Sequence, residues 1–371
     1  MALSLETEIS ENLGIEYPVF AFNHCRDVIA AVSNGGGIGV LGATGLSPEG
    51  ILAEGTWLRK HTDKPFGMDI LLPAKAPGTG TKQDLLDAIP KENIEFMSKL
   101  REELDLPKAT APQSTNPNVM DLGVGGTTAS QMEQVDAICE VKPAVFAGGL
   151  GMSAEVVERC HSAGIKVISL VGNVRQAKKV AAWGVDFIVA QGTEAGGHTG
   201  RIGTLALVPV VVDAVKPIPV IAAGGIGGGR GLAASLALGA GGVWTGTIWL
   251  MAHENPLADF IKERMLAATE EDAVITRAHT GKTARSLNTK FIEYWQQAGA
   301  PEPVNAPFQG MYLPVPWGVS TEDPSRFWEE RGLQEWIGTP AGQVMAQMKE
   351  RKGAKQILFD MVSEAMDIIE D

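Results

Sequence analysis

Ile218-Pro-Val-Ile-Ala-Ala-Gly-Gly-Ile-Gly-Gly-Gly-Arg-Gly231, followed shortly by Gly241-Gly-Val-Trp-Thr-Gly-Thr247, is the stretch that decides the fold. Residues 219–223 form a short apolar run between a proline and a glycine, which is typical of a strand buried on both faces. Gly224-Gly225 follows at once, where the backbone must turn sharply. A segment of helical composition then leads to a second apolar run over residues 243–247. Strand, glycine turn, helix and strand together predict one unit of a parallel sheet.

Both of these predicted strands end in small residues, Gly224-Gly225 and Gly246-Thr247. Such strand ends offer uncovered N–H groups to an anion. In a barrel of eight α/β units, the loops after strands seven and eight form the usual phosphate site. The alternative is that the glycines serve only tight turns and close helix–strand packing. Because the same signature recurs one unit later, we favour the phosphate site.

The chain of 371 residues is long enough for a (β/α)₈ TIM barrel of ~250 residues with ~120 to spare. Eight short apolar runs, the expected strands, cover residues 17–22, 38–41, 66–72, 144–147, 166–171, 186–190, 219–223 and 243–247. Helical segments alternate with them, which predicts an α/β fold with parallel strands. An open, doubly wound sheet would show the same alternation, but the even spacing favours the closed barrel.

We expect residues 1–255 to form the barrel, with a lid-like insertion at 73–119 after strand three. Residues 256–371 are expected to form a C-terminal helical extension packed on the barrel. Predicted local features are a helix capped by Asp27, helices over 91–104 and 256–268, a loop over 278–288, a proline-rich segment over 300–325 and a helical tail over 343–371. Gly37 to Gly42 spells G-x-G-x-x-G, but it follows a helix and enters a strand. That order is opposite to a dinucleotide fingerprint, so these glycines are interpreted as structural.

Charge and composition exclude several classes of function. The net charge of −13 argues against nucleic acid or an anionic membrane as partner. The N-terminus lacks the apolar core of a signal peptide, and no apolar run reaches membrane-spanning length. Cys25, Cys139 and Cys160 are odd in number without a C-x-x-C pair, which predicts a reduced, cytoplasmic setting. The six histidines show no ligand spacing, so no metal is expected.

The sixth predicted strand runs into Gln191-Gly-Thr-Glu-Ala-Gly-Gly-His-Thr-Gly-Arg201. A loop so rich in glycine lacks the side chains needed to bury His198, so we expect the ring to be exposed at the barrel mouth. Imidazole suits a general base or a hydrogen-bond donor to an anion near neutral pH. The alternative is a histidine with a purely structural role. Glu194 is interpreted as a salt-bridge partner.

This loop, the Pro-Val-Ile-Ala-Ala-Gly-Gly-Ile stretch and Gly-Val-Trp-Thr-Gly-Thr together resemble the nitronate monooxygenases, formerly called 2-nitropropane dioxygenases. The segment Thr280-Gly-Lys-Thr-Ala-Arg-Ser-Leu-Asn288 resembles the post-barrel part of that family, and the resemblance covers about residues 15–300. FMN-dependent enoyl-acyl-carrier-protein reductases and NADH:quinone reductases share the fold and nearly identical motifs. The motifs therefore define the superfamily better than the substrate.

The resemblance implies a TIM barrel that holds FMN without a covalent bond. It implies His198 as the catalytic residue and a cofactor site formed by Ala21, Phe22, Asn23, Asp69, Gln191, Gly192, Gly197, Ala223, Gly224, Gly225, Gly246 and Thr247. The phosphate would lie on the last four of these, and residues 21–23 would line the flavin ring through backbone groups.

Two features depart from the family pattern beside this site. Relatives commonly have Pro-Met-Ala-Gly after the first strand, where this chain has Asn23-His-Cys-Arg26. Some relatives end strand five with a lysine, where this chain has Leu170. A thiol site formed by His24, Cys25 and Asp27 is one alternative for the first departure, and a polar loop with a capping Asp27 is the simpler interpretation.

The first hypothesis for function is oxidation of an alkyl nitronate by FMN and O₂ to a carbonyl compound and nitrite. The second is an NAD(P)H-dependent flavin reductase of an enoyl thioester or quinone. The third is a flavin-free barrel that binds a sugar phosphate as an aldolase or synthase, although no lysine follows a strand as a Schiff-base residue would. Four tryptophans of the post-barrel region either pack the tail onto the barrel or form the contact of a homodimer: Trp295, Trp317, Trp328 and Trp336.

Overall fold

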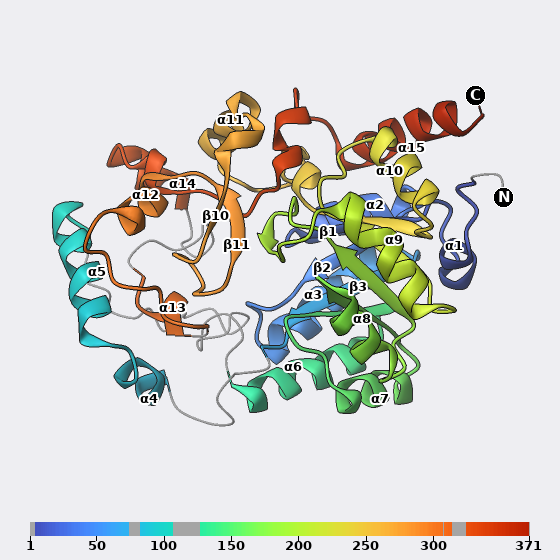
Figure 1. The fold of residues 1–371 in the computed structure, drawn as a ribbon, viewed down its shortest axis with the longest axis horizontal. Helices are drawn as coiled ribbons and strands as arrows, with labels where there is room; N and C mark the ends of the chain where they lie inside the picture. The colour runs from blue at the N-terminus through green and yellow to red at the C-terminus, as the bar shows by residue number, and fades with distance from the viewer. Residues whose placement is uncertain (1–3, 74–81, 107–126, 307, 314–323, 371) are drawn as a thin grey trace.

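The computed structural model describes residues 4–73, 82–106, 127–306, 308–313 and 324–370. Eight parallel strands close into a barrel in the order β1-β2-β3-β4-β5-β6-β8-β9 (Figure 1). Their bounds are β1 Val19–Asn23, β2 Ile38–Gly42, β3 Phe66–Leu71, β4 Val145–Gly149, β5 Lys166–Val171, β6 Phe187–Gln191, β8 Val220–Ala223 and β9 Gly242–Thr245. The predicted (β/α)₈ barrel is confirmed, and the open sheet is excluded because β9 pairs with β1.

Helices follow the barrel strands, as the alternating pattern predicted. Those around the barrel are α2 Arg26–Asn34, α3 Pro48–His61, α6 Thr128–Val141, α7 Ala154–Ser162, α8 Val174–Ala181, α9 Thr204–Val215 and α10 Gly229–Ala237, with α1 Glu8–Leu13 before β1. Those of the insertion and extension are α4 Lys82–Asp87, α5 Lys91–Glu103, α11 Asp259–Ala267, α12 Lys290–Gln296, α13 Phe308–Met311, α14 Pro324–Glu330 and α15 Ala354–Glu370. Short 3₁₀ helices are η1 Thr247–Met251, η2 Glu270–Asp272, η3 Gln334–Trp336 and η4 Gln343–Gln347.

Two apolar clusters fill the two faces of the barrel sheet. The inner cluster contains alternate strand residues such as Phe20, Val40 and Trp244, whereas the residues between them pack outward against the helices. On β3, Met68 and Ile70 belong to the outer cluster. Because side chains alternate along a strand, Asp69 faces the barrel interior.

A second, antiparallel sheet lies beside the barrel. It has the order β10-β11-β7, with bounds β10 Ala273–Thr276, β11 Ala284–Leu287 and β7 Gly197–His198. Figure 1 shows this sheet together with α4, α5 and α12–α14 on one side of the barrel. The insertion after strand three packs on the extension, since the Phe96 ring on α5 lies 4.7 Å from that of Tyr294 and 5.1 Å from that of Trp295 on α12. Of the predicted 73–119 lid, residues 74–81 and 107–119 lie outside the described residues, so its covering role stays a prediction.

The C-terminal helix α15 closes over the barrel exterior and packs on α10 and α2. The Gly229 amide at the start of α10 donates to Glu364 Oε2 at 2.6 Å, so a carboxylate caps that helix. Trp295 and Trp328 are buried within the single chain, and Trp317 lies outside the described residues. The division of the chain at residue 255 stays a prediction. Within the described residues, no helix has both the length and the apolar character needed to cross a membrane.

Three local predictions were wrong. Cys25, not Asp27, is the N-cap of α2, and Asp27 lies in the first turn, where its charge complements the helix N-terminus. Part of the predicted 278–288 loop is the strand β11, which is formed by pairing with β10 and β7 rather than by local preference. The predicted tail helix over 343–371 starts only at Ala354, after a 3₁₀ turn, and Asp371 lies outside the described residues. The described parts of the 300–325 segment include α13 and the start of α14.

Candidate active site at the barrel mouth

The predicted site residues lie at the C-terminal ends of neighbouring barrel strands. In the strand register Gln191 on β6 pairs with Ala223 on β8, and Ala223 pairs with Trp244 on β9. Thr245 then pairs with Ala21 on β1. One continuous arc of the rim therefore carries the loops that the sequence predicted to hold a cofactor.

The rim of β8 and β9 has the features of an anion cradle. Gly224 and Gly225 have φ values of +99° and +71°, a backbone conformation that side chains rarely adopt. Within the described part of the chain, the amides of Gly225 and Gly246 donate no hydrogen bond. Gly225 is exposed and Gly246 is half-buried, so both donors are accessible. These residues fit a phosphate group, because unpaired amides at adjacent strand ends are suited to its oxygens.

Glu194 holds the loop after β6 against this cradle. Its carboxylate accepts from the Thr204 amide at 3.1 and 3.0 Å and from the Thr204 hydroxyl at 2.8 Å. That hydroxyl also lies 2.9 Å from the Gly224 carbonyl oxygen. The predicted salt-bridge role of Glu194 is therefore wrong: the carboxylate caps the first turn of α9, and no ion pair is found for it among the described residues.

A post-barrel segment, which the sequence did not point to, also lies on the rim. The Gly342 amide donates to Thr247 Oγ1 at 2.9 Å, and the Gln343 amide donates to the Glu194 carbonyl at 3.0 Å. The approach is close enough that a Cβ added to Gly196 would lie 2.7 Å from the Ala341 carbonyl carbon. Gly196 is thus needed for packing against the tail. In the sequence, the only sign of this contact was the pair of small residues Ala341-Gly342, which lies between Pro340 and η4.

His198 is not in an open loop, and its predicted exposure at the mouth is wrong. Gly197 and His198 form β7, in which His198 pairs with Ala284 on β11. The half-buried His198 ring places Nε2 2.9 Å from Thr280 Oγ1. Burial lowers the pKa of His198 to about 4, and the positive charge of Lys282 adds to that effect. The imidazole is therefore neutral near pH 7, with one ring nitrogen directed to Thr280.

Gln191 and Asp69 place polar groups on the inner side of the same mouth. The Gln191 side-chain amide donates to the His198 carbonyl oxygen, which ties the end of β6 to β7. Asp69 is 4% exposed, and burial raises the pKa of its carboxyl to about 7. Among the described residues this carboxyl has no hydrogen-bond partner. A neutral carboxylic acid at this position is able to donate a hydrogen bond to a ligand.

At the end of β1, the groups available to a ligand are backbone groups, except for the side chain of Phe22. Ala21 packs in the outer cluster, and the Asn23 side chain is occupied by bonds from the Cys25 amide at 2.9 Å and from Asn255 at 3.1 Å. Phe22 faces inward and stacks on Trp244 at 5.9 Å. The Cys25 thiol is buried, and burial raises its pKa, so it is not a reactive thiolate. The structure thus favours the interpretation of residues 23–26 as a polar loop with a structural role, and not as a thiol site.

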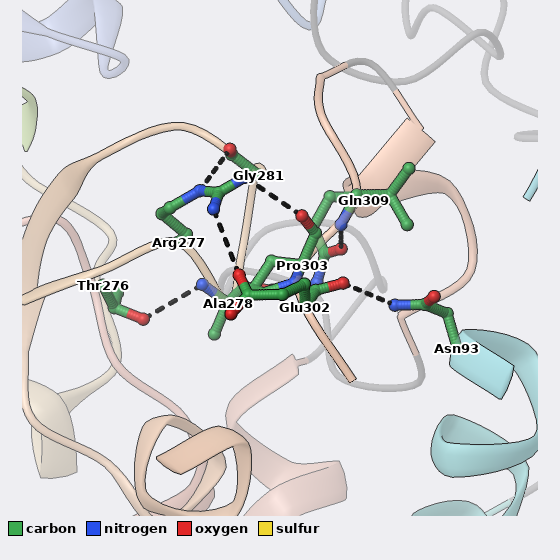
Figure 2. A network of polar contacts seen from close by, with 9 residues as sticks. Asn93, Thr276, Arg277, Ala278, Gly281, Glu302, Pro303 and Gln309 are labelled. Atoms are coloured by element: carbon green, nitrogen blue, oxygen red, sulfur yellow. Dashed lines mark hydrogen bonds and ion pairs between the residues drawn. The ribbon is translucent and has the colours of Figure 1, made fainter. Parts of the chain in front are cut away.

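The loop that carries Thr280 is clamped by the network of Figure 2. Arg277 Nε donates to the Gly281 carbonyl at 2.9 Å, and its other nitrogens bind Glu302 at 3.3 Å and the Pro303 carbonyl at 3.1 Å. Gly281 has a φ of +73°, and a Cβ there would lie 1.7 Å from the Val304 carbonyl oxygen. The partner of His198 is therefore held in a fixed position.

A cleft of about 530 Å³ lies beside this loop. It includes Thr193 and Arg201 of the loop after β6, Ile275 of β10 and Trp295 of α12, and none of the predicted cofactor-binding residues. Elsewhere in the described chain, no group of three potential metal ligands comes together.

Comparison with known proteins gives a consistent result. The family model described as nitronate monooxygenase matches residues 7–364. A protein of Mycobacterium tuberculosis named as a monooxygenase is 39% identical, with 98% of each chain covered. The solved nitroalkane oxidase of Streptomyces ansochromogenes is 25% identical, covers 97% of this chain and 98% of its own, and has a TM-score of 0.75. FabK from Thermotoga maritima is 27% identical, covers 99% of this chain and 98% of its own, and has a TM-score of 0.70.

Proposed function

This chain belongs to the nitronate monooxygenase family and is a flavin-dependent oxidoreductase, and from that premise we propose that it binds FMN and oxidises alkyl nitronates with O₂. The products would be a carbonyl compound and nitrite. The observation that carries this proposal is the rim of the barrel, where a phosphate cradle on β8 and β9 adjoins the loop that holds His198.

The phosphate end of the proposed site uses backbone amides. Gly225 and Gly246 supply unpaired donors, and Gly224 provides the turn that exposes them. Thr247 is tied to Gly342, which fixes the start of η1 beside the cradle. A monophosphate tail such as that of FMN matches donors of this kind, because it needs several hydrogen bonds within one small concave surface.

FMN bound with its ring toward His198 would supply the redox chemistry, by which two nitronates and one O₂ give two molecules of carbonyl compound and two of nitrite. His198 is neutral at pH 7, so of the two roles that imidazole suits, we propose the base that takes the α-proton of a nitroalkane. The anion would then lie close to the charge of Lys282, which was not among the predicted site residues. Thr280 holds the imidazole in place for this transfer.

Anaerobic titration of the purified yellow protein tests this function. Propyl-2-nitronate should bleach the flavin absorbance, and nitrite should appear when O₂ is admitted. NAD(P)H alone should not bleach it. Bleaching by NAD(P)H but not by the nitronate would contradict the proposal. It would favour the flavin reductase, because the reductases named above share the fold and nearly identical motifs. The flavin-free aldolase is excluded by the family.

The cellular setting and assembly are part of the same proposal. Cys25, Cys139 and Cys160 are all free thiols, which supports a reduced, cytoplasmic location. A homodimer stays a prediction, and sedimentation of the purified protein measures it directly.

A further inference from the structure

His24 lies over the open end of the barrel. Gly42 belongs to the inward-facing set of β2, because Ile38 and Val40 are in the inner cluster. A Cβ added to Gly42 would lie 2.5 Å from Cε1 and 2.6 Å from Nδ1 of His24. The His24 ring therefore occupies the space that a side chain at position 42 would fill. The residue is nevertheless solvent-exposed, whereas Asn23 and Cys25 on either side are buried.

The orientation of the His24 ring is fixed from two directions. Nδ1 lies 2.8 Å from the Gly42 carbonyl oxygen. The ring meets Phe22 edge-to-face at 5.3 Å, and Phe22 in turn stacks on Trp244 inside the barrel. A ring held in this way is part of the mouth rather than a free surface side chain.

These contacts also set which nitrogen is available. A carbonyl oxygen only accepts hydrogen bonds, so the proton of the neutral ring lies on Nδ1. Nε2 then carries a lone pair, and no donor among the described residues binds it.

Resting on the FMN site proposed above, we propose that His24 contacts the bound flavin, with Nε2 accepting a hydrogen bond from the ring N–H or a ribityl hydroxyl. Oxidised flavin has one ring N–H, and the ribityl chain has hydroxyls, so both parts offer a suitable donor. The mouth would then have two imidazoles with separate tasks. His24 binds the cofactor from the β1–β2 side, and His198 acts on the substrate from the β6–β7 side.

Flavin affinity in matched variants tests this inference. His24→Ala removes the ring, and Gly42→Ala displaces it through the added Cβ. Fluorescence quenching should show a rise of about three- to tenfold in the FMN dissociation constant for both variants, the size expected for one lost hydrogen bond. His161→Asn is the control, because His161 is paired with Asp186 at the opposite ends of the strands. It should bind FMN as the wild type does.

Two further experiments identify the flavin group that contacts His24. Lumiflavin lacks the ribityl chain, so weaker lumiflavin binding by His24→Ala assigns the ring N–H, and an effect on FMN alone assigns a ribityl hydroxyl. In protein labelled with ¹⁵N-histidine, FMN should shift the Nε2 signal that His24→Ala removes. Unchanged dissociation constants in both variants, with an unmoved Nε2 signal, would overturn the inference while leaving the proposed function intact. A wild-type protein that does not bind FMN would instead refute the proposed function.

Discussion

The barrel mouth is built from two kinds of group. On the rim of β8 and β9 the available groups are the backbone amides of Gly225 and Gly246. Elsewhere on the rim the site contains the side chains of His24, Asp69 and His198, on or after β1, β3 and β6. A site built from backbone is changed only by adding atoms or moving the chain. A site built from side chains is changed by any substitution that alters a proton or a lone pair. We therefore expect substitutions in the cradle to change affinity for the cofactor and substitution of His198 to change reactivity.

Removing the imidazole of His198 should give the largest effect. His198→Asn keeps a polar group of similar size but no base, so kcat should fall by ~10²–10⁴. The flavin should remain bound, because the cradle is untouched. Steady-state nitrite release from a nitroalkane, whose α-proton the base must remove, measures the turnover, and the absorbance of the purified variant measures the bound flavin. His161→Asn is the control for loss of an imidazole elsewhere. Unchanged turnover in His198→Asn would remove the distinction between the cradle and the side chains.

A single methyl group in the cradle should affect binding instead. Gly224→Ala places a Cβ at a φ of +99°, 2.9 Å from the Gly192 carbonyl oxygen. The turn must shift to relieve this contact and the strain of ~1–3 kcal/mol, which displaces the Gly225 amide. FMN binding should therefore weaken by about 10- to 100-fold, while the turnover of flavin-saturated enzyme stays close to wild type. Titration of stripped protein with FMN measures the change.

Gly164→Ala is its matched control. Gly164 has a φ of +77°, with no atom within 4 Å of an added Cβ, and lies in the turn before β5. It should lose thermal stability without losing affinity for FMN. If FMN binding weakened equally in both variants, the loss would come from backbone strain and not from a change in the cradle.

The hydrogen bond to His198 should have an intermediate effect. Thr280→Val removes the hydroxyl 2.9 Å from Nε2 with little change in shape. A misoriented base should lower kcat about tenfold and should also move the pH profile, which a loss of packing would not do. Thr283→Val in the same loop is the control. If both variants keep the wild-type profile, Thr280 has no role in orienting the base.

The buried carboxyl of Asp69 should give the smallest effect, seen as a pH dependence of stability. Its folded pKa of about 7 is raised above the unfolded value, so the folded state binds more protons between pH 4 and 7. Stability contributed by Asp69 therefore falls as pH rises through that range. In flavin-stripped protein, Asp69→Asn should match the wild-type Tm near pH 4 and exceed it at pH 7. A constant difference at all pH values would contradict the raised pKa.

The sequence was most informative about the part of the site that is formed by backbone groups. The runs before Gly224 and Gly246 are apolar and punctuated by glycine, so the strands and the rim were predictable from local chemistry. The cradle needs only backbone freedom, which glycine reports directly.

It was least informative where the structure uses distant contacts. The glycines around His198 indicated an open loop, but Gly197 and His198 pair with β11, about 85 residues later, and Gly196 packs on Ala341. Thr280 and Gly342 reach the site through tertiary folding, which leaves no periodic signal. The capping role of Glu194 is likewise set by α9 rather than by the residues beside it in sequence.

A crystal structure of the protein grown with FMN is the most direct test of this division of the mouth between backbone and side chains. The phosphate should lie within hydrogen-bonding distance of the Gly225 and Gly246 amides, with the flavin ring beside His198. A cradle without phosphate density, or a His198 ring turned away from the flavin, would contradict the assignment of phosphate binding to the cradle and of reactivity to His198.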